Sequence, residues 1–193
     1  MTADAKSRTR KGTAEKLVRA AAQEFNRHGY LGTDTNRIAR RAGFAPQTFY
    51  RWFRDKTSIF IMVYEQWQQE EASMLQGLLA NDASDARLVD AVVSHHKSYR
   101  EFRRSLRQLA VEDREVRTAR ARGRLNQIGQ IRTWNPEQPD STAQLAVALL
   151  QFERLADALA EGEFHDMGLD ERTAKAMLAS LIRRFRSSSR DDE

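Results

Sequence analysis

Cysteine is absent from this 193-residue chain, and helix-breaking residues are scarce, with three prolines and nine glycines. Without thiols, neither a disulfide nor a thiolate metal site can form, and the histidine spacing suggests no other metal site. Few prolines, glycines and β-branched runs favour helices over sheets. No window approaches the roughly 18 apolar residues of a membrane-spanning helix, and residues 1–16 hold no apolar stretch for a signal peptide. We therefore expect a cytoplasmic, all-α protein with no metal and no membrane partner.

Charge is divided unevenly along the chain, although the total is only +5. Residues 1–56 hold 13 Lys and Arg against 5 Asp and Glu, a net charge of +8, whereas residues 57–193 hold 19 against 22, a net charge of −3. A basic N-terminal segment is suited to binding phosphates. It is equally compatible with a solvated tail, so charge alone leaves both interpretations open.

Apolar residues recur at helical spacing along most of the chain, which predicts about nine helices and no strand. Two breaks interrupt the pattern, at residues 81–84 and in the proline-containing stretch 134–141. The expected helices lie at about 14–28, 34–42, 46–53, 58–79, 85–98, 100–110, 113–133, 142–161 and 170–187.

Residues 34–53 form the segment with the clearest chemistry. They predict two short helices joined at Gly43, apolar along one face and rich in phosphate- and base-binding side chains along the other. A helix-turn-helix needs this pattern, because its two helices pack against a third while the second leaves its outer face free for the major groove. The helix at 14–28 supplies the third partner. The apolar residues of the three helices are Leu17, Ala21, Phe25, Ile38, Ala39, Ala42, Phe49 and Phe53.

Several residues at fixed spacing give the stretch from Leu17 to Tyr64 a specific signature. They are Phe25-x-x-x-Gly29-Tyr30, Thr33, Ile38-Ala39, Ala42-Gly43, Thr48-Phe49-Tyr50-x-x-Phe53 and Lys56. In these positions the sequence resembles the TetR family of repressors. The resemblance implies a sequence-specific transcriptional regulator, most simply a ligand-responsive repressor that binds a palindromic double-stranded DNA operator as a homodimer.

The resemblance also implies a division of the chain into domains. A helix-turn-helix DNA-binding domain is expected at 13–57, followed by a helical effector-binding and dimerisation domain at 58–187. The polar ends, 1–12 and 188–193, are expected to form a disordered basic arm and a frayed tail.

The resemblance implies DNA contacts by five residues on or near the two short helices. The hydroxyls of Thr35 and Tyr50 can hold phosphates, and Asn36 can reach a base edge. Lys56 matches the phosphate-contacting lysine of the family. Trp52 either packs against the sugar-phosphate backbone or is a partly buried wedge.

On the recognition helix itself, three side chains are expected to face outward. Gln47 can read adenine, Arg51 can read guanine, and Thr48 lies between them in the sequence. Two departures from the family pattern affect this region: Asp34 stands where Ser or Thr is usual and repels DNA while capping its helix, and Pro46 removes one potential contact. The expected DNA-binding residues are Thr35, Asn36, Gln47, Thr48, Tyr50, Arg51, Trp52 and Lys56.

Two amphipathic helices near the C-terminus, at 142–161 and 170–187, are expected to form the dimer contact. Their apolar faces are wide and include small residues that let helices approach closely. An intramolecular core would explain the same pattern, but a two-fold operator requires a two-fold protein, which favours a four-helix seam between subunits. The expected interface residues are Leu145, Leu149, Phe152, Leu155, Ala174, Met177, Leu178, Leu181, Ile182 and Phe185.

A small-molecule effector, and no cofactor, is expected in the helical domain. Aromatic and methionine side chains more often belong to a core than to a binding site, so the pocket assignment depends on the way the family arranges these helices around a cavity. The candidate pocket residues are Tyr64, Trp67, Met74, Phe102, Trp134 and Phe152.

Three other kinds of protein fit only parts of the sequence. An enzyme needs a converging nucleophile, base and orienting group or a glycine-rich phosphate loop; the sequence contains neither, so no catalytic residue is expected. A helical interaction or scaffold protein leaves Gln47, Tyr50 and Arg51 without a purpose. A nonspecific nucleic-acid binder would use only the basic segment, and its binding would fall steeply with salt.

Overall fold

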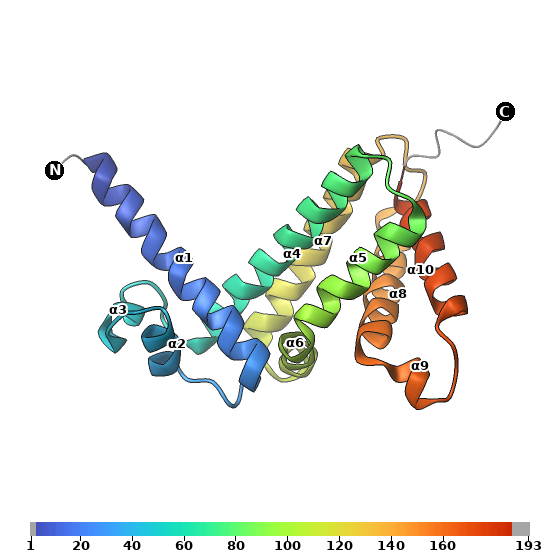
Figure 1. Ribbon diagram of the computed structural model, residues 1–193. Helices are drawn as coiled ribbons and strands as arrows, with labels where there is room; N and C mark the ends of the chain where they lie inside the picture. The colour runs from blue at the N-terminus through green and yellow to red at the C-terminus, as the bar shows by residue number, and fades with distance from the viewer. Residues whose placement is uncertain (1–2, 187–193) are drawn as a thin grey trace. The chain divides into compact units, whose positions relative to one another are not determined.

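The computed structural model describes residues 3–186, with side chains from Gly12 onward, and within that range it contains ten α-helices and no strand (Figure 1). The all-α prediction is therefore confirmed. The helices are α1 (Ala3–His28), α2 (Thr35–Arg41), α3 (Pro46–Tyr50), α4 (Lys56–Ala80), α5 (Asp85–Ser98), α6 (Arg100–Glu112), α7 (Arg114–Trp134), α8 (Thr142–Glu161), α9 (Glu163–Asp166) and α10 (Arg172–Phe185).

The described residues form two compact units. Unit 1 contains the chain up to Trp67 together with Glu101–Ala119, and unit 2 contains Gln68–Arg100 and the residues from Arg120 onward. Helices α4 and α7 each contribute residues to both units.

Three details differ from the sequence-based expectation. α1 begins at Ala3 rather than near residue 14, so the backbone of the predicted disordered arm is helical from residue 3. Ala, Lys and Arg have high helix propensity and no proline intervenes, so a helix fixed by its buried C-terminal half extends toward the N-terminus. α3 ends at Tyr50 instead of Phe53, and α9 is a tenth helix. The arm's side chains and the predicted tail at 188–193 lie outside the described residues.

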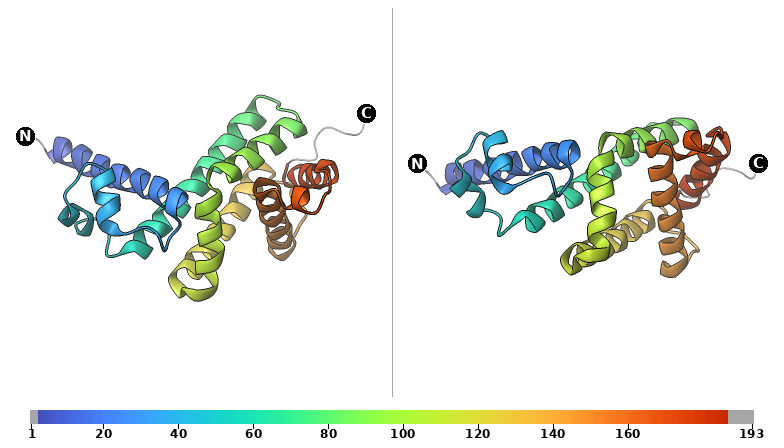
Figure 2. Two further views of the ribbon diagram at one scale, coloured as in Figure 1. Left: turned by 60° about the horizontal axis from the view of Figure 1, so that its bottom comes forward. Right: turned by 90° about the horizontal axis from the view of Figure 1, so that it is seen from below.

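Unit 1 is built around aromatic side chains from α1, α4 and α6. Phe25, Phe60 and Phe102 are fully buried, and the Phe60 ring centroid lies 5.0 Å from that of Phe25 and 4.7 Å from that of Phe102. Ile38 on α2 and Phe49 on α3 are also fully buried. Because α2 and α3 are too short to be stable alone, this burial holds them beside α1, as Figure 2 shows.

A buried carboxylate adds a polar link between α1 and α2. Glu24 is 2% exposed and accepts a hydrogen bond from Nε of Arg41, while Nε of Arg37 lies 3.5 Å from its second oxygen. Hydrogen bonds between ionised groups are stronger than neutral ones. The basic side chains of α2 therefore help to fix the angle at which it meets α1.

Unit 2 has its own apolar core, in which α5, α8 and α10 lie side by side (Figure 1). Leu88, Leu149 and Leu178, one from each of these helices, are buried there. α8 starts with a capping box in which Ser141 and Gln144 exchange hydrogen bonds, a pattern that stabilises a helix start.

A polar cluster is buried within unit 2. Nδ1 of His96 lies 2.8 Å from Oδ1 of Asp157, and its Nε2 lies 3.0 Å from Oε1 of Glu71. All three side chains are almost completely buried. Buried polar groups destabilise a protein unless they are paired. The three side chains therefore need one another as partners, and their contacts hold α4, α5 and α8 in one specific arrangement.

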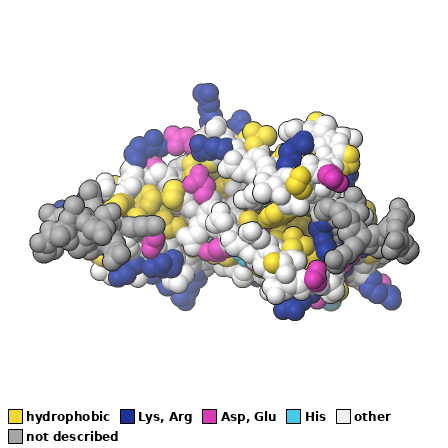
Figure 3. All heavy atoms as spheres, turned by 90° about the horizontal axis from the view of Figure 1, so that it is seen from above, with side chains coloured by type: hydrophobic (Ala, Val, Ile, Leu, Met, Phe, Trp, Pro, Cys, Tyr) yellow, Lys and Arg dark blue, Asp and Glu magenta, His cyan; other side chains and the backbone are white. Residues whose placement is uncertain are grey.

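Charged side chains of both signs lie on the surface. On the face shown in Figure 3, Lys and Arg side chains are interspersed with Asp and Glu. Among the described residues, no helix has the length and apolar character that crossing a membrane requires. The same residues contain no group of three His, Asp or Glu side chains positioned to hold a metal ion.

Candidate nucleic-acid interface

The short helix α3 presents polar side chains to solvent because its apolar side chains are anchored inward. Phe49 is fully buried and Phe53, just beyond the helix, is 8% exposed, with the two ring centroids 5.6 Å apart. Gln47 and Arg51 are exposed, and Thr48 is partly buried. The three predicted base-reading positions therefore lie at or near the surface of unit 1.

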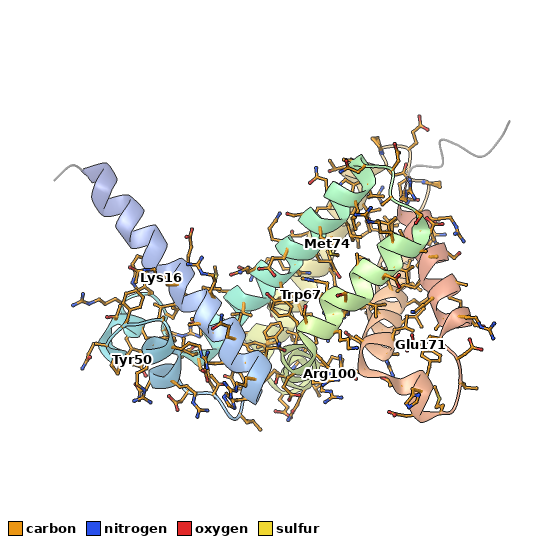
Figure 4. All side chains as sticks on the ribbon, in the orientation of Figure 1. Lys16, Tyr50, Trp67, Met74, Arg100 and Glu171 are labelled. Atoms are coloured by element: carbon orange, nitrogen blue, oxygen red, sulfur yellow. The ribbon has the colours of Figure 1, made fainter. Side chains whose placement is uncertain are left out.

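The hydroxyls of Thr35 and Tyr50 lie 2.9 Å apart, within hydrogen-bonding distance. Thr35 opens α2 and Tyr50, labelled in Figure 4, closes α3; Tyr50 is 59% exposed. One hydroxyl donates its proton to the other in this bond, so the accepting hydroxyl keeps its own proton to donate to a phosphate oxygen. The sequence indicated both residues, but only the structure brings them together.

The start of α2 is capped by Asp34. Oδ1 of Asp34 accepts a hydrogen bond of 2.7 Å from the backbone N–H of Arg37. Asn36, beside the cap, is exposed. The carboxylate that departs from the family pattern is thus engaged in a structural contact with its own helix.

Lys56 makes its recorded contacts with the loop between α1 and α2. Its Nζ donates hydrogen bonds to the carbonyl oxygens of Tyr30 at 2.8 Å and Thr33 at 2.9 Å, and lies 4.1 Å from the centroid of the Tyr30 ring. Burial lowers the pKa of Lys56 below its ordinary value. Two of its three ammonium protons are committed to the protein, so these contacts favour a positioning role over a direct phosphate contact.

Tyr30 is a residue whose role the sequence did not indicate. Its backbone N–H donates to Oγ of Ser105 at 3.0 Å, and its hydroxyl lies 2.7 Å from Oγ1 of Thr57. Burial raises the pKa of Tyr30 above its ordinary value. The fixed Gly29-Tyr30 pair was the available signal, but nothing in it pointed to α4 and α6. Trp52 is partly buried, which is compatible with both interpretations of this residue.

Unit 2 contains a partly open cavity of about 60 Å³ bounded by residues of α4, α5, α7, α8 and α10. Of the six candidate pocket residues, Trp134 and Phe152 line it. Most of the other lining side chains are leucine, isoleucine and phenylalanine, with glutamines, one glutamate and one arginine among them.

The other four candidate pocket residues do not line this cavity. Tyr64, Trp67 and Phe102 belong to unit 1, where they are buried. The guanidinium carbon of Arg103 lies 4.3 Å from the centroid of the Trp67 ring. Met74 packs against the core of unit 2. Aromatic residues that belong to a core and those that line a cavity have the same sequence pattern. Only the tertiary packing distinguishes the two groups.

The ten predicted interface residues lie on two different faces of α8 and α10. Met177 is 61% exposed, and Leu155 and Leu181 are partly buried; all three line a surface groove with the exposed Leu150 and Met167. The other seven are buried within one chain and cannot also contact a second one. These seven residues are Leu145, Leu149, Phe152, Ala174, Leu178, Ile182 and Phe185.

Residues 17–63 match the family model of bacterial regulatory proteins, tetR family. Among curated proteins, the uncharacterized HTH-type transcriptional regulator YdgC of Bacillus subtilis (strain 168) is 29% identical over 65 residues. That alignment covers 34% of this chain and 33% of the relative. The chain thus matches this relative over about a third of the length of each protein.

Solved structures share the fold over nearly the whole chain. A protein from Rhodococcus sp. described as a TetR-family transcriptional regulator is 16% identical, with a TM-score of 0.65, covering 89% of this chain and 96% of its own. The transcriptional regulator FadR of Bacillus subtilis, solved in complex with stearoyl-CoA, is 16% identical with a TM-score of 0.55, again covering 89% and 96%. At this identity the likeness shows the fold alone.

Proposed function

We propose that this chain is a ligand-responsive, non-enzymatic repressor that binds a palindromic operator as a homodimer. The match of residues 17–63 to the tetR family model and the fold shared with solved transcriptional regulators support this proposal. The observation that carries the proposal is the polar surface of α3. It consists of a helix anchored by Phe49 that leaves Gln47 and Arg51 exposed and Tyr50 paired with Thr35.

Each of these side chains has a role that its chemistry allows. Arg51 reads guanine through two parallel hydrogen bonds and Gln47 reads adenine, while Thr48 approaches a base or sugar beside them. Tyr50 and Thr35 hold one phosphate together, and Asn36 reaches the edge of the groove.

The proposed dimer uses the groove side of α8 and α10. Leu150, Met167 and Met177 are large apolar side chains that one chain leaves exposed. Contiguous exposed apolar surface commonly marks a protein contact. A two-fold contact would also supply the second recognition helix, which a palindromic operator requires.

The proposed effector site is the cavity of unit 2. FadR of Bacillus subtilis, which shares the fold, was solved with stearoyl-CoA, and this supports a small-molecule ligand for this chain. Helix α4 begins at Lys56, against the loop that precedes α2, and reaches the cavity through Gln68 and Leu75. A ligand that binds the operator-free conformation more tightly would lower operator affinity by shifting the population of that conformation.

The test is fluorescence anisotropy of the full chain on the DNA that flanks its own gene, near physiological salt and against scrambled competitor. We expect sequence-selective binding. Arg51→Ala should weaken it by about 1–3 kcal/mol and relax the base preference at one position. Tyr50→Phe should weaken binding to all sequences alike.

Arg172→Ala is the matched control, because Arg172 is exposed on α10 in unit 2. It should leave operator affinity unchanged. Equal binding to operator and scrambled DNA would show that unit 1 binds DNA nonspecifically, through charge alone. If no sequence selected from random DNA is bound, the interaction or scaffold function takes the place of the proposal.

A further inference from the structure

Glu24 on α1 is a buried carboxylate that faces two arginines of α2. Nε of Arg41 donates a hydrogen bond to its Oε1. Its Oε2 is screened from solvent and accepts no hydrogen bond from the residues that the structure describes, but it lies 3.5 Å from Nε of Arg37 and 3.8 Å from Nε2 of His28. A buried charge strongly destabilises a protein unless opposite charges compensate it. Glu24 therefore depends on the two arginines and attracts both of them.

Each of the two arginines has a second contact within unit 1. Nη1 of Arg37 donates to the carbonyl oxygen of Gly32 at 3.0 Å, and Nη1 of Arg41 donates to Oε1 of Gln23 at 3.5 Å. The side chains of Arg37 and Arg41 are nevertheless 45% and 34% exposed. Both guanidinium groups therefore lie at the surface, where contacts with α1 and with the loop before α2 hold them in place.

The helix that carries these arginines also contributes to the candidate nucleic-acid interface. α2 has seven residues, which rise about 10 Å, and it begins at Thr35, the partner of Tyr50. An arginine side chain on α2 therefore starts within about 10 Å of this pair. Contacts between arginine and phosphate carry no sequence information, and they supply most of the nonspecific affinity of a protein for DNA. An arginine that is held away from the phosphates adds nothing to that nonspecific affinity.

We infer that Glu24 raises the sequence selectivity of DNA binding by holding Arg37 and Arg41 away from the phosphates. Glu24 is then a specificity-determining residue that does not itself touch DNA. The inference rests on the proposed DNA-binding function, to which it adds a restraint on nonspecific binding by the basic side chains of α2.

The test measures the salt dependence of affinity in the full chain and in Glu24→Gln, by anisotropy on the DNA that flanks the gene and on scrambled DNA. Glutamine has nearly the same shape but no charge, so its hold on both guanidinium groups is weaker. Each added phosphate contact steepens the slope of log K against log salt by about 0.9.

We expect Glu24→Gln to steepen the slope on scrambled DNA by about 1–2 and to raise the affinity for this DNA at least about threefold at low salt. The preference for the operator over scrambled DNA should fall. A carboxylate that served only the stability of the fold would not steepen the slope when it is replaced. An unchanged or shallower slope would overturn the inference.

Glu15→Gln is the matched control, because Glu15 is an exposed glutamate on the same helix. It removes the same charge without releasing an arginine, so it should change the slope much less than Glu24→Gln does. Equal steepening in the two variants would show a general effect of net charge, and the inference would fail.

Two variants of the arginines give an independent answer, even if Glu24→Gln folds poorly by circular dichroism. Arg37→Gln in a chain that keeps Glu24 should leave the slope unchanged, whereas a flatter slope would show that Arg37 already contacts a phosphate. Adding Arg37→Gln and Arg41→Gln to Glu24→Gln should return the slope to that of the unmodified chain. A slope that stays steep would exclude the two arginines as the released groups.

The outcomes distinguish the inference from the proposed function. If the unmodified chain selects its operator and Glu24→Gln does not steepen the slope, only the inference fails. If the unmodified chain binds operator and scrambled DNA equally while Glu24→Gln steepens the slope, the sequence-specific function fails and the restraint on the two arginines is supported. If neither chain binds DNA, both fail.

Discussion

At the scale of single residues, Gly29 and Gly43 differ in what a side chain would cost at each position. Gly29, after α1, and Gly43, after α2, have φ values of +66° and +80°, a region that disfavours other residues. A Cβ on Gly43 would meet nothing within 4 Å, whereas one on Gly29 would lie 3.3 Å from Oε1 of Glu101 and 3.4 Å from Oγ of Ser105. Only Gly29 therefore faces both penalties.

We predict that Gly43→Ala lowers the free energy of unfolding by about 1–2 kcal/mol through strain alone. Gly29→Ala should lower it further, because Ser105 must also shift and it accepts the hydrogen bond from the Tyr30 N–H. Urea denaturation with an unchanged m-value measures both changes. Equal losses in the two variants would contradict the crowding seen at Gly29.

A second residue-scale prediction concerns Lys56. Lys56→Met removes the two hydrogen bonds to the carbonyl oxygens of Tyr30 and Thr33. The Tyr30 carbonyl keeps the hydrogen bond from the Thr33 N–H, but the Thr33 carbonyl loses its Lys56 partner, which should lower the free energy of unfolding by about 1–3 kcal/mol. Lys16→Met, at an exposed position of α1, is the control and should have little effect. If Lys56→Met weakens DNA binding without loss of stability, Lys56 is a phosphate contact and not an anchor for the loop.

At the scale of elements, the start of α4 depends on Asp55. Its Oδ1 accepts a 2.8 Å hydrogen bond from the N–H of Ser58, and its own N–H donates to Oγ of Ser58 at 3.3 Å. Burial by itself would raise the pKa of Asp55, but hydrogen bonds from Arg54 and Ser58 outweigh it and hold the pKa below its ordinary value of 3.8. The ionised carboxylate of Asp55 is therefore stabilised more in the folded state than in the unfolded state.

From this direction the sign of the pH dependence follows. A lowered folded pKa means that the stabilisation is fully present above the unfolded pKa and is lost as pH falls through the folded value. We predict that Asp55→Asn is less stable than the unmodified protein by up to about 1 kcal/mol near pH 7. The difference should shrink as the pH falls below about 4. Chemical denaturation across this pH range measures it, with exposed Asp166→Asn as control; a difference independent of pH would disprove it.

At the scale of the whole molecule, the prediction concerns the proposed dimer contact through the groove of α8 and α10. A glutamate in a buried apolar contact is strongly unfavourable, so Met177→Glu and Leu150→Glu should each convert the dimer to a monomer and weaken operator binding. Leu125→Glu is the control, because Leu125 is 61% exposed on α7 and does not line the groove. Sedimentation equilibrium reports the mass. A dimer that survives both substitutions would place the contact elsewhere.

The sequence by itself determined the helical class and most of the helix-turn-helix. The spacing of Ile38 and Phe49, the Asp34 cap and the position of Pro46 in the first turn of α3 are local signals, readable within a few residues. The resemblance to the TetR family predicted DNA contacts by Gln47 and Arg51, whose side chains have the donors and acceptors to read base edges.

Only the tertiary structure decided which surfaces these helices use. The apolar stripe of α10 contains both buried Leu178 and exposed Met177, and helical periodicity cannot divide such a wide stripe between core and surface. The pairing of Thr35 with Tyr50 and the contacts of Glu24 with the arginines of α2 depend in the same way on contacts between distant residues. The local sequence pattern determines where a helix forms and which of its faces are apolar. Residues far along the chain determine which of these faces is covered and which remains free to bind.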